Sequence, residues 1–181
     1  MLTTFAVYVD DAPGVLNRVA SLFRRRAFNI VSLTVGHTEE AGVSRMTLVV
    51  DADIPPERIC ANLYKLIDVR RVEVLAPRTS VERDLAMIKV ATSPMSRGEV
   101  MQLVQVFRAR VVDVAPDSLI VEITGGEDKV DGLLEVLRPF GILEMVRTGR
   151  VAMARGAAPR ADAADTGDSV PAAQDDVAYS V

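Results

Sequence analysis

The residues from Asp10 to Leu16 are the part of the sequence whose types and spacing could bind a small ligand. A run of β-forming residues ends there, Pro13-Gly14 makes a turn, and an amphipathic pattern begins at Val15. Gly14 leaves the backbone bare, so a ligand can approach it closely. The first amides of a helix lack intrahelical partners and, with the helix dipole, favour a carboxylate. Asp11 could bind an ammonium group or cap the turn, so this chemistry leaves a ligand site and an ordinary turn both open.

The remaining reactive side chains do not form a catalytic set. The sequence has one cysteine, Cys60, and one histidine, His37, so neither an internal disulfide nor a zinc site of Cys and His ligands can form within one chain. We expect Cys60 to be a structural thiol in a helix and His37 to lie on the surface at a strand end. The sequence also lacks a nucleophile elbow and a P-loop. It therefore predicts a chain that is not an enzyme by itself and holds no metal.

Composition and charge exclude several other classes. Of the 181 residues, 49% are hydrophobic and 25% are charged, which is typical of a soluble globular protein. No apolar run is long enough to span a membrane, and the first residues do not form a secretory signal. The net charge of −4 argues against nucleic-acid binding, and Arg24-Arg25-Arg26 falls at an expected helix end, where cations complement the dipole. With its lone thiol, the chain is expected to be cytoplasmic.

The first part of the chain shows a β-α-β-β-α-β order in its hydrophobic periodicity. Strands are expected where apolar residues alternate, and helices where they recur about every 3.6 residues. The expected elements are a strand at 2–10, a helix from 15 to about 28, a strand at 30–37, a further strand through 46–50, a helix opening at 54–56 and a strand at 69–75. This order is that of the split-βαβ or ferredoxin-like arrangement.

The second part repeats that order without repeating the residues. Capping boxes are expected at Ser96 with Glu99 and at Thr124 with Glu127. The expected strands lie at 85–91, 110–114, 119–123 and 142–153, with helices after 96 and after 124. The predicted fold class is therefore α+β, with two tandem ferredoxin-like βαββαβ units at 1–76 and 77–156. The Ala/Asp-rich residues 157–181 are expected to form a disordered tail.

These segments carry a family resemblance. The motif Asp11-x-Pro-Gly-Val-Leu-x-Arg-Val, followed by Phe28-Asn29-Ile30-x-Ser32-Leu33, resembles the ACT domain of the regulatory (small) subunit of acetohydroxyacid synthase, also called acetolactate synthase. The similarity continues through Ser44-Arg45-Met46-Thr47, Leu63 to Val69, Val81 to Leu85 and, more loosely, Arg147 to Arg150. It covers roughly residues 1–156 and implies an N-terminal ACT domain followed by the family's C-terminal, ACT-like domain.

The resemblance also implies an effector site and a dimer. ACT domains of this family pair side by side, and a branched-chain amino acid, typically valine, binds at the interface. Asp11, Gly14 and Val15 of one protomer would hold its carboxylate and amino groups, and Asn29 and Ile30 of the facing protomer would complete the pocket. Many family members have Asn where this chain has Asp11. A carboxylate there suits an ammonium partner but adds negative charge near the ligand carboxylate.

The resemblance further implies a catalytic partner. The large subunit of acetolactate synthase is a separate chain that carries thiamine diphosphate, a magnesium ion and FAD. It condenses two pyruvates, or pyruvate with 2-oxobutyrate, in valine, leucine and isoleucine biosynthesis. The small subunit itself carries no cofactor, activates the catalytic subunit and confers feedback inhibition.

The spacing of the predicted site residues is consistent with a dimer. Gly14 and Asn29 flank one helix, so they lie at its opposite ends, and one protomer cannot easily supply both halves of a pocket. A twofold dimer solves this. Two other classes remain as alternatives: a ligand-sensing transcription factor, which the acidic balance disfavours, and an enzyme on the same scaffold, which lacks a visible nucleophile–base pair.

Overall fold

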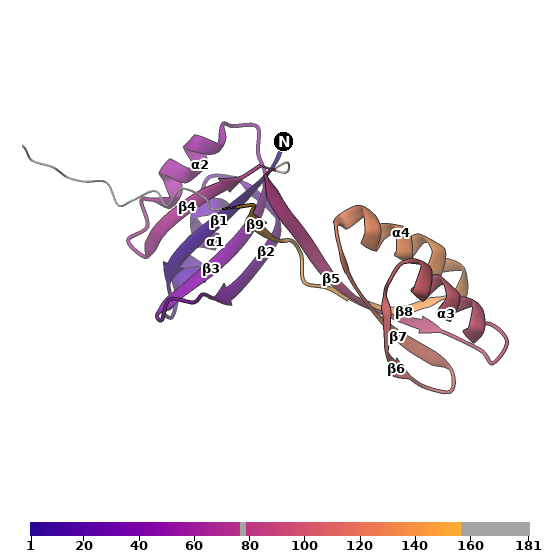
Figure 1. Ribbon diagram of the computed structural model, residues 1–181. Helices are drawn as coiled ribbons and strands as arrows, with labels where there is room; N and C mark the ends of the chain where they lie inside the picture. Colours follow the sequence, from indigo (N-terminus) through magenta and orange to yellow (C-terminus); the bar gives the residue numbers. More distant parts are fainter. Residues whose placement is uncertain (77–78, 157–181) are drawn as a thin grey trace, which may run out of the picture.

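The computed structural model describes residues 1–76 and 79–156, which form two α+β units in tandem (Figure 1). The tail expected at 157–181 and the residue Pro77 at the expected join lie outside the described residues. No helix in the described part of the chain is long and apolar enough to cross a membrane.

The first unit is a four-stranded antiparallel sheet with two helices. Its elements are β1 (Leu2–Asp10), α1 (Val15–Arg25), β2 (Asn29–His37), β3 (Val43–Asp51), α2 (Pro56–Leu63) and β4 (Val69–Leu75). The strand order is β2-β3-β1-β4, so β2 and β4 are the edge strands. Because side chains alternate across a strand, every second residue of β1 and β3 faces the helices.

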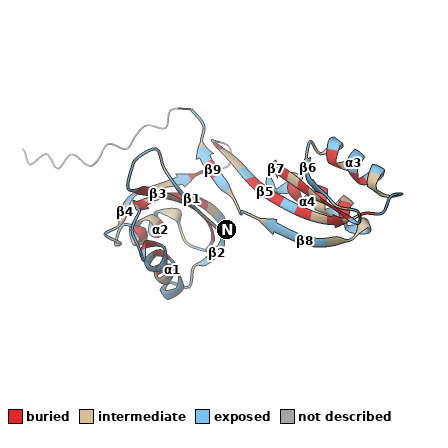
Figure 2. Ribbon diagram, turned by 90° about the horizontal axis from the view of Figure 1, so that it is seen from below, coloured by how far each residue is buried: buried red, intermediate tan, exposed pale blue. Residues whose placement is uncertain are grey.

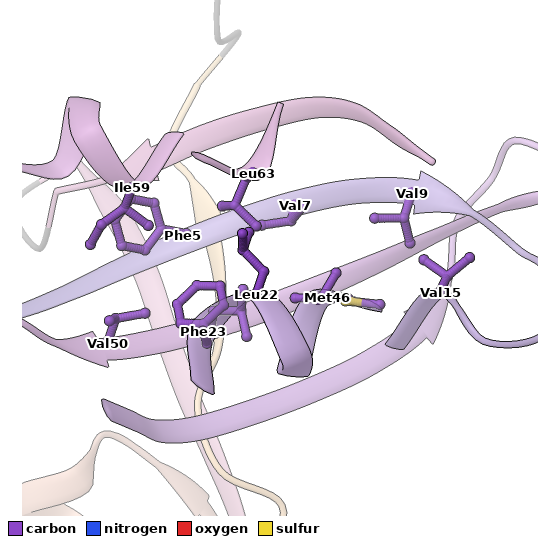
Figure 3. Close-up of a cluster of buried hydrophobic side chains, with 12 residues drawn as sticks. Phe5, Val7, Val9, Val15, Leu22, Phe23, Met46, Val50, Ile59 and Leu63 are labelled. Atoms are coloured by element: carbon purple, nitrogen blue, oxygen red, sulfur yellow. The ribbon is translucent and has the colours of Figure 1, made fainter. Parts of the chain in front are cut away.

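The core of the first unit lies between the sheet and the two helices. Figure 3 shows its side chains converging from β1, β3, α1 and α2. The helix α1 buries Val15, Val19, Leu22 and Phe23, which recur at a helical period. It ends at Arg25, a few residues before the predicted end, because Ala27 has a φ of 56° and turns the chain out of the helix. Arg24 and Arg25 lie in its last turn, as expected.

The second unit repeats the topology. Its elements are β5 (Ser80–Ala91), α3 (Arg97–Val106), β6 (Arg110–Val114), β7 (Ser118–Gly125), α4 (Glu127–Leu137), a short 3₁₀ turn (Arg138–Phe140), β8 (Ile142–Arg147) and β9 (Val151–Ala154). The strand order β6-β7-β5-β8 matches that of the first sheet, and a separate core lies beneath α3 and α4 (Figure 2). The predicted fold class, tandem ferredoxin-like βαββαβ units, is confirmed.

The last strand differs from its prediction. The segment 142–153 was expected as one strand, but it divides into β8 and β9, and Gly149 between them has a φ of 84°. β9 pairs with the early residues 80–83 of β5, which extend that strand beyond its predicted start at 85. Ala152 of β9 packs against Ala6 and Leu75 on the first sheet. The chain therefore returns to its N-terminal unit at its described end.

Both predicted capping boxes are wrong. Ser96 stands at the N-cap of α3, but its side chain makes no capping hydrogen bond; its Oγ instead accepts from the amide of Ser93 at 2.9 Å. Thr124 lies within β7, and α4 begins at Glu127 with Gly126 as its N-cap. The strand extends further than the local pattern indicated because its pairing with β5 continues to Gly125.

Candidate functional site

The turn before α1 has the geometry that the sequence suggests. Gly14 is the N-cap of α1 with a φ of 87° and a ψ of −8°, a left-handed conformation that favours glycine. Among the described residues, the amides of Leu16 and Asn17 have no hydrogen-bond acceptor. They point out from the positive end of the helix dipole. The turn therefore offers two free donors at a place where the backbone is open to a ligand.

Asp11 is already held by its own unit. Its amide donates to the carbonyl of Gly42 at 2.9 Å. Its Oδ1 accepts a hydrogen bond from Ser44 Oγ at 3.2 Å, and its Oδ2 lies 3.3 Å from His37 Nδ1. His37 is exposed, as expected, but it has a partner that the sequence reasoning missed. The signal for it lies in the register of β2 and β3, which pairs His37 with Ser44.

Two arginines form ion pairs that connect the loops around the turn. Arg18 of α1 makes a bidentate contact with Asp68, with atom distances of 2.6 and 2.8 Å. Arg70 contacts Asp10 at 2.6 Å and Glu40 at 2.9 Å. The hydrogen bond to Asp10 is the main cause that raises the pKa of Arg70 above its ordinary value. Because these pairs join the turn to the loop before β4 and to the β2–β3 hairpin, they hold the turn in place.

The other predicted residues divide between the two ends of α1. Val15 follows Gly14 but is only 3% exposed, so its side chain belongs to the core. Asn29 begins β2 and is exposed, and Ile30 is half-buried against the core. The eleven residues of α1 separate the two groups by about 16 Å at 1.5 Å per residue. The single chain thus brings Asp11, Gly14 and Val15 together and leaves Asn29 and Ile30 apart from them.

The other features of the described residues are weaker candidates for the effector site than this turn. A hollow of about 560 Å³ lies on the open face of the first sheet, lined by Tyr8, Arg45 and Arg71 among others, but not by the predicted effector residues. Arg71 stacks on the Tyr8 ring at 3.9 Å and also contacts Glu73 at 3.2 Å, so it is engaged within the unit. The described residues contain no cluster of three potential metal ligands.

Cys60 occupies the position expected of a structural thiol. It lies in α2, is half-buried and packs against the core of the first unit. Burial is the main cause that raises the pKa of the Cys60 thiol, and the nearby Glu57 carboxylate raises it further. A protonated thiol is a poor nucleophile and a poor metal ligand at neutral pH. Cys60 therefore has the properties of a packing residue.

Comparison with known proteins agrees with the fold of both units. Residues 5–71 match the family described as the AHAS small subunit-like ACT domain, and residues 83–156 match the family described as the small subunit of acetolactate synthase. The fold and these matches thus define the chain as a protein with an ACT domain followed by a second α+β unit of the same topology.

Similar proteins cover both units. A relative from Archaeoglobus fulgidus is 52% identical over 157 residues, which are 86% of this chain and 98% of the relative. The acetolactate synthase small subunit from Bacillus subtilis is 46% identical over 160 residues, 87% of this chain and 93% of that protein. The crystal structure of the acetolactate synthase small subunit from Thermotoga maritima superposes with a TM-score of 0.83 at 38% identity, covering 87% of this chain and 99% of that one. The chain belongs to the acetolactate synthase small-subunit family.

Proposed function

We propose that this chain is the non-catalytic regulatory subunit of a cytoplasmic acetolactate synthase and that it makes the enzyme sensitive to a branched-chain amino acid, valine. It would bind the catalytic large subunit and raise its activity. Thiamine diphosphate, magnesium and FAD would reside on that partner and would supply the chemistry of condensation. Membership of the small-subunit family supports the regulatory role, and the geometry of β2 and the turn supports the effector site.

The free edge of β2 is the observation that carries the effector proposal. β2 pairs only with β3 among the described strands, and Val31 and Val35 on it are 55% and 47% exposed. An unpaired apolar edge is a template for another strand. If β2 pairs antiparallel with β2 of a second copy about its central residue, Leu33, then Asn29 of the second copy lies opposite His37. His37 is the residue that contacts Asp11, so the twofold pairing brings the two halves of the predicted site together.

The assembled site would suit a zwitterionic amino acid with a branched side chain. The amides of Leu16 and Asn17 would receive the carboxylate, because they are free donors at a helix N-terminus. Asp11 would accept from the ammonium group in a charge-assisted hydrogen bond. Ile30 of the second copy would offer apolar surface to the side chain, and burial of that surface favours valine over smaller amino acids.

Regulation requires that the effector bind two states of the complex with different affinity. Because the site is divided between protomers, valine would stabilise one packing of the two ACT domains. A coupling free energy of about 1–3 kcal/mol between effector site and catalytic centre corresponds to a change of about 5–150-fold in affinity. Such a coupling is enough for feedback control.

The test is calorimetric titration of valine into the isolated chain, combined with assay of the enzyme reconstituted from both subunits. We expect heat of binding, inhibition by valine, and a dimer in analytical ultracentrifugation. Asn29→Ala should weaken valine binding because it removes the second half of the site. Asn62→Ala in α2, which loses only a bond to the Arg58 carbonyl, serves as the control. Absence of binding heat together with an uninhibited enzyme would refute the valine proposal.

A further inference from the structure

The last residue of β8, Arg147, and the three residues that link β8 to β9, numbers 148–150, join the two units, and we call residues 147–150 the connecting segment. Figure 2 shows the chain running from β8 past β2 to β9. The amide of Arg150 donates to Ser32 Oγ at 2.9 Å, and Thr34 Oγ1 donates to the Arg150 carbonyl at 3.1 Å. A Cβ on Gly149 would lie 2.3 Å from Ser32 Oγ. Glycine is thus required for the segment to approach β2 this closely.

The same segment is tied to the second unit by two arginines. Arg150 contacts Glu127, the first residue of α4, at 2.8 Å, and Glu82 of β5 at 3.2 Å. Its side chain is only 19% exposed. Arg147 contacts Asp131, one turn further along α4, at 2.7 Å, and Asp84 of β5 at 3.2 Å. These four contacts fix the segment to the start of α4 and to β5.

Ser32 and Thr34, whose side chains contact the connecting segment, flank Leu33, the middle residue of β2. Ser32 is two residues from Ile30, and β2 is the strand whose outer edge would form the dimer. Any displacement of β2 therefore changes the bonds to the connecting segment, and through Arg150 it changes the placement of α4. One oxygen of Glu82, Oε1, is buried and has no hydrogen-bond partner among the described residues, so the ion pair is incompletely satisfied in this arrangement.

We propose that the connecting segment transmits effector occupancy from β2 to the second unit, with Arg150 as the positioning residue. The proposal rests on the proposed function, since it needs an effector at the ends of α1. It adds that the second unit responds through Ser32, Arg150 and α4. Such coupling requires that both sites bias the same element. The measurement must therefore separate effector binding from its consequence.

The experiment compares Arg150→Gln with the wild-type chain in three measurements: the valine dissociation constant of the isolated regulatory chain, the activation of the catalytic subunit without valine, and the valine concentration for half-inhibition. We expect the dissociation constant to stay within about twofold and activation to be retained. The half-inhibitory concentration should rise at least about fivefold, the lower end of typical allosteric couplings. Hydrogen exchange should show valine-induced protection of residues 29–33 in both proteins, but of residues 127–137 in the wild type only.

Two further variants keep the test decisive. Ser32→Ala removes one hydrogen bond to the segment without leaving a buried charge, and it should produce the same pattern if Arg150→Gln folds poorly. Arg110→Gln breaks an ion pair with Glu122 inside the second sheet and should leave all measurements unchanged. If valine inhibits the variants as strongly as the wild type, this inference alone is overturned. It is also overturned if the valine dissociation constant rises by the same factor as the half-inhibitory concentration. A wild-type chain that neither binds valine nor confers inhibition would overturn the proposed function, and this inference with it.

Discussion

Gly14 and Gly98 are both glycines near the start of a helix, yet alanine should have opposite effects on stability at these positions. Gly14→Ala places a Cβ on a residue with a φ of 87°, whereas Gly98 lies inside α3 and a Cβ there meets no atom within 4 Å. We expect Gly14→Ala to destabilise the protein and Gly98→Ala to stabilise it. The pair controls for the general effect of a glycine-to-alanine change on the unfolded chain.

The magnitudes follow from the local geometry. An L-residue in the left-handed region loses about 1–2 kcal/mol. At Gly14 the new Cβ would also lie 3.3 Å from Arg18 Nη1. The Arg18 guanidinium, which is held by Asp68 through Nε and Nη2, must then give way by a few tenths of an ångström. We therefore expect Gly14→Ala to lower the free energy of unfolding by about 1–2 kcal/mol, or Tm by about 2–8 °C. Gly98→Ala should raise the free energy by about 0.5–1 kcal/mol, the difference in helix propensity.

Urea unfolding followed by circular dichroism measures both changes in stability. They should appear as shifts of the urea concentration at half-unfolding, while the slope of the unfolding free energy against urea concentration stays constant. Valine titration of the same proteins adds a second comparison. In the proposed site, the Cβ of Gly14→Ala would crowd a ligand held at the Leu16 and Asn17 amides, so valine binding should weaken, while Gly98→Ala should bind as the wild type does. Equal stability changes at the two positions would refute the conformational argument, and unchanged valine affinity in Gly14→Ala would refute the role of the turn.

Three further substitutions or modifications test other parts of the structure. Leu133→Ala, at a fully buried position of α4, should lower the free energy of unfolding by about 2–5 kcal/mol in chemical denaturation. Arg18→Gln leaves Asp68, only 13% exposed, without its charged partner, and should lower the free energy of unfolding by about 1–3 kcal/mol in the same assay. Because burial raises the pKa of Cys60, iodoacetamide should react with the folded chain at higher pH than with the urea-unfolded chain. By the same linkage, the contribution of Cys60 to stability should be full below the ordinary thiol pKa and lost as pH rises through the folded value, measured by urea unfolding between pH 7 and 10.

The repeated βαββαβ order could be predicted because each element carries its own periodicity. The strands β1 and β4 have the predicted bounds, since alternation of apolar and polar residues is a local signal. The pairing of Ser80 with Ala154 was not predicted, because those residues are far apart in sequence and β9 has only four residues. A strand that short has too few alternations to be recognised. Gly149, whose positive φ separates β8 from β9, was the available signal for the break.

The candidate site was predicted as far as one helix and its turn determine it. The turn at Gly14, the free amides and the opposite placement of Asn29 follow from local chemistry and helix length, whereas the left-handed conformation of Gly14 was not predicted. The partners of Asp11 were not predicted, because His37 and Ser44 reach it only through the register of the β2–β3 hairpin. In the proposed dimer, the assembly of the two half-sites would also depend on a second chain, and no local pattern encodes its register.

The contacts of Asp11 explain how an acidic residue could be part of the proposed effector site, which would also have to bind a ligand carboxylate. Ser44 holds one oxygen and His37 faces the other, so the side chain is oriented before any ligand arrives. A carboxylate has about four acceptor positions. An ammonium group can therefore bind Asp11 without displacing either neighbour. The ligand carboxylate would bind instead to amides at the positive end of α1, where the helix dipole offsets the charge of Asp11. An acidic residue in this position thus favours a ligand that carries both an ammonium group and a carboxylate over one that carries a carboxylate alone.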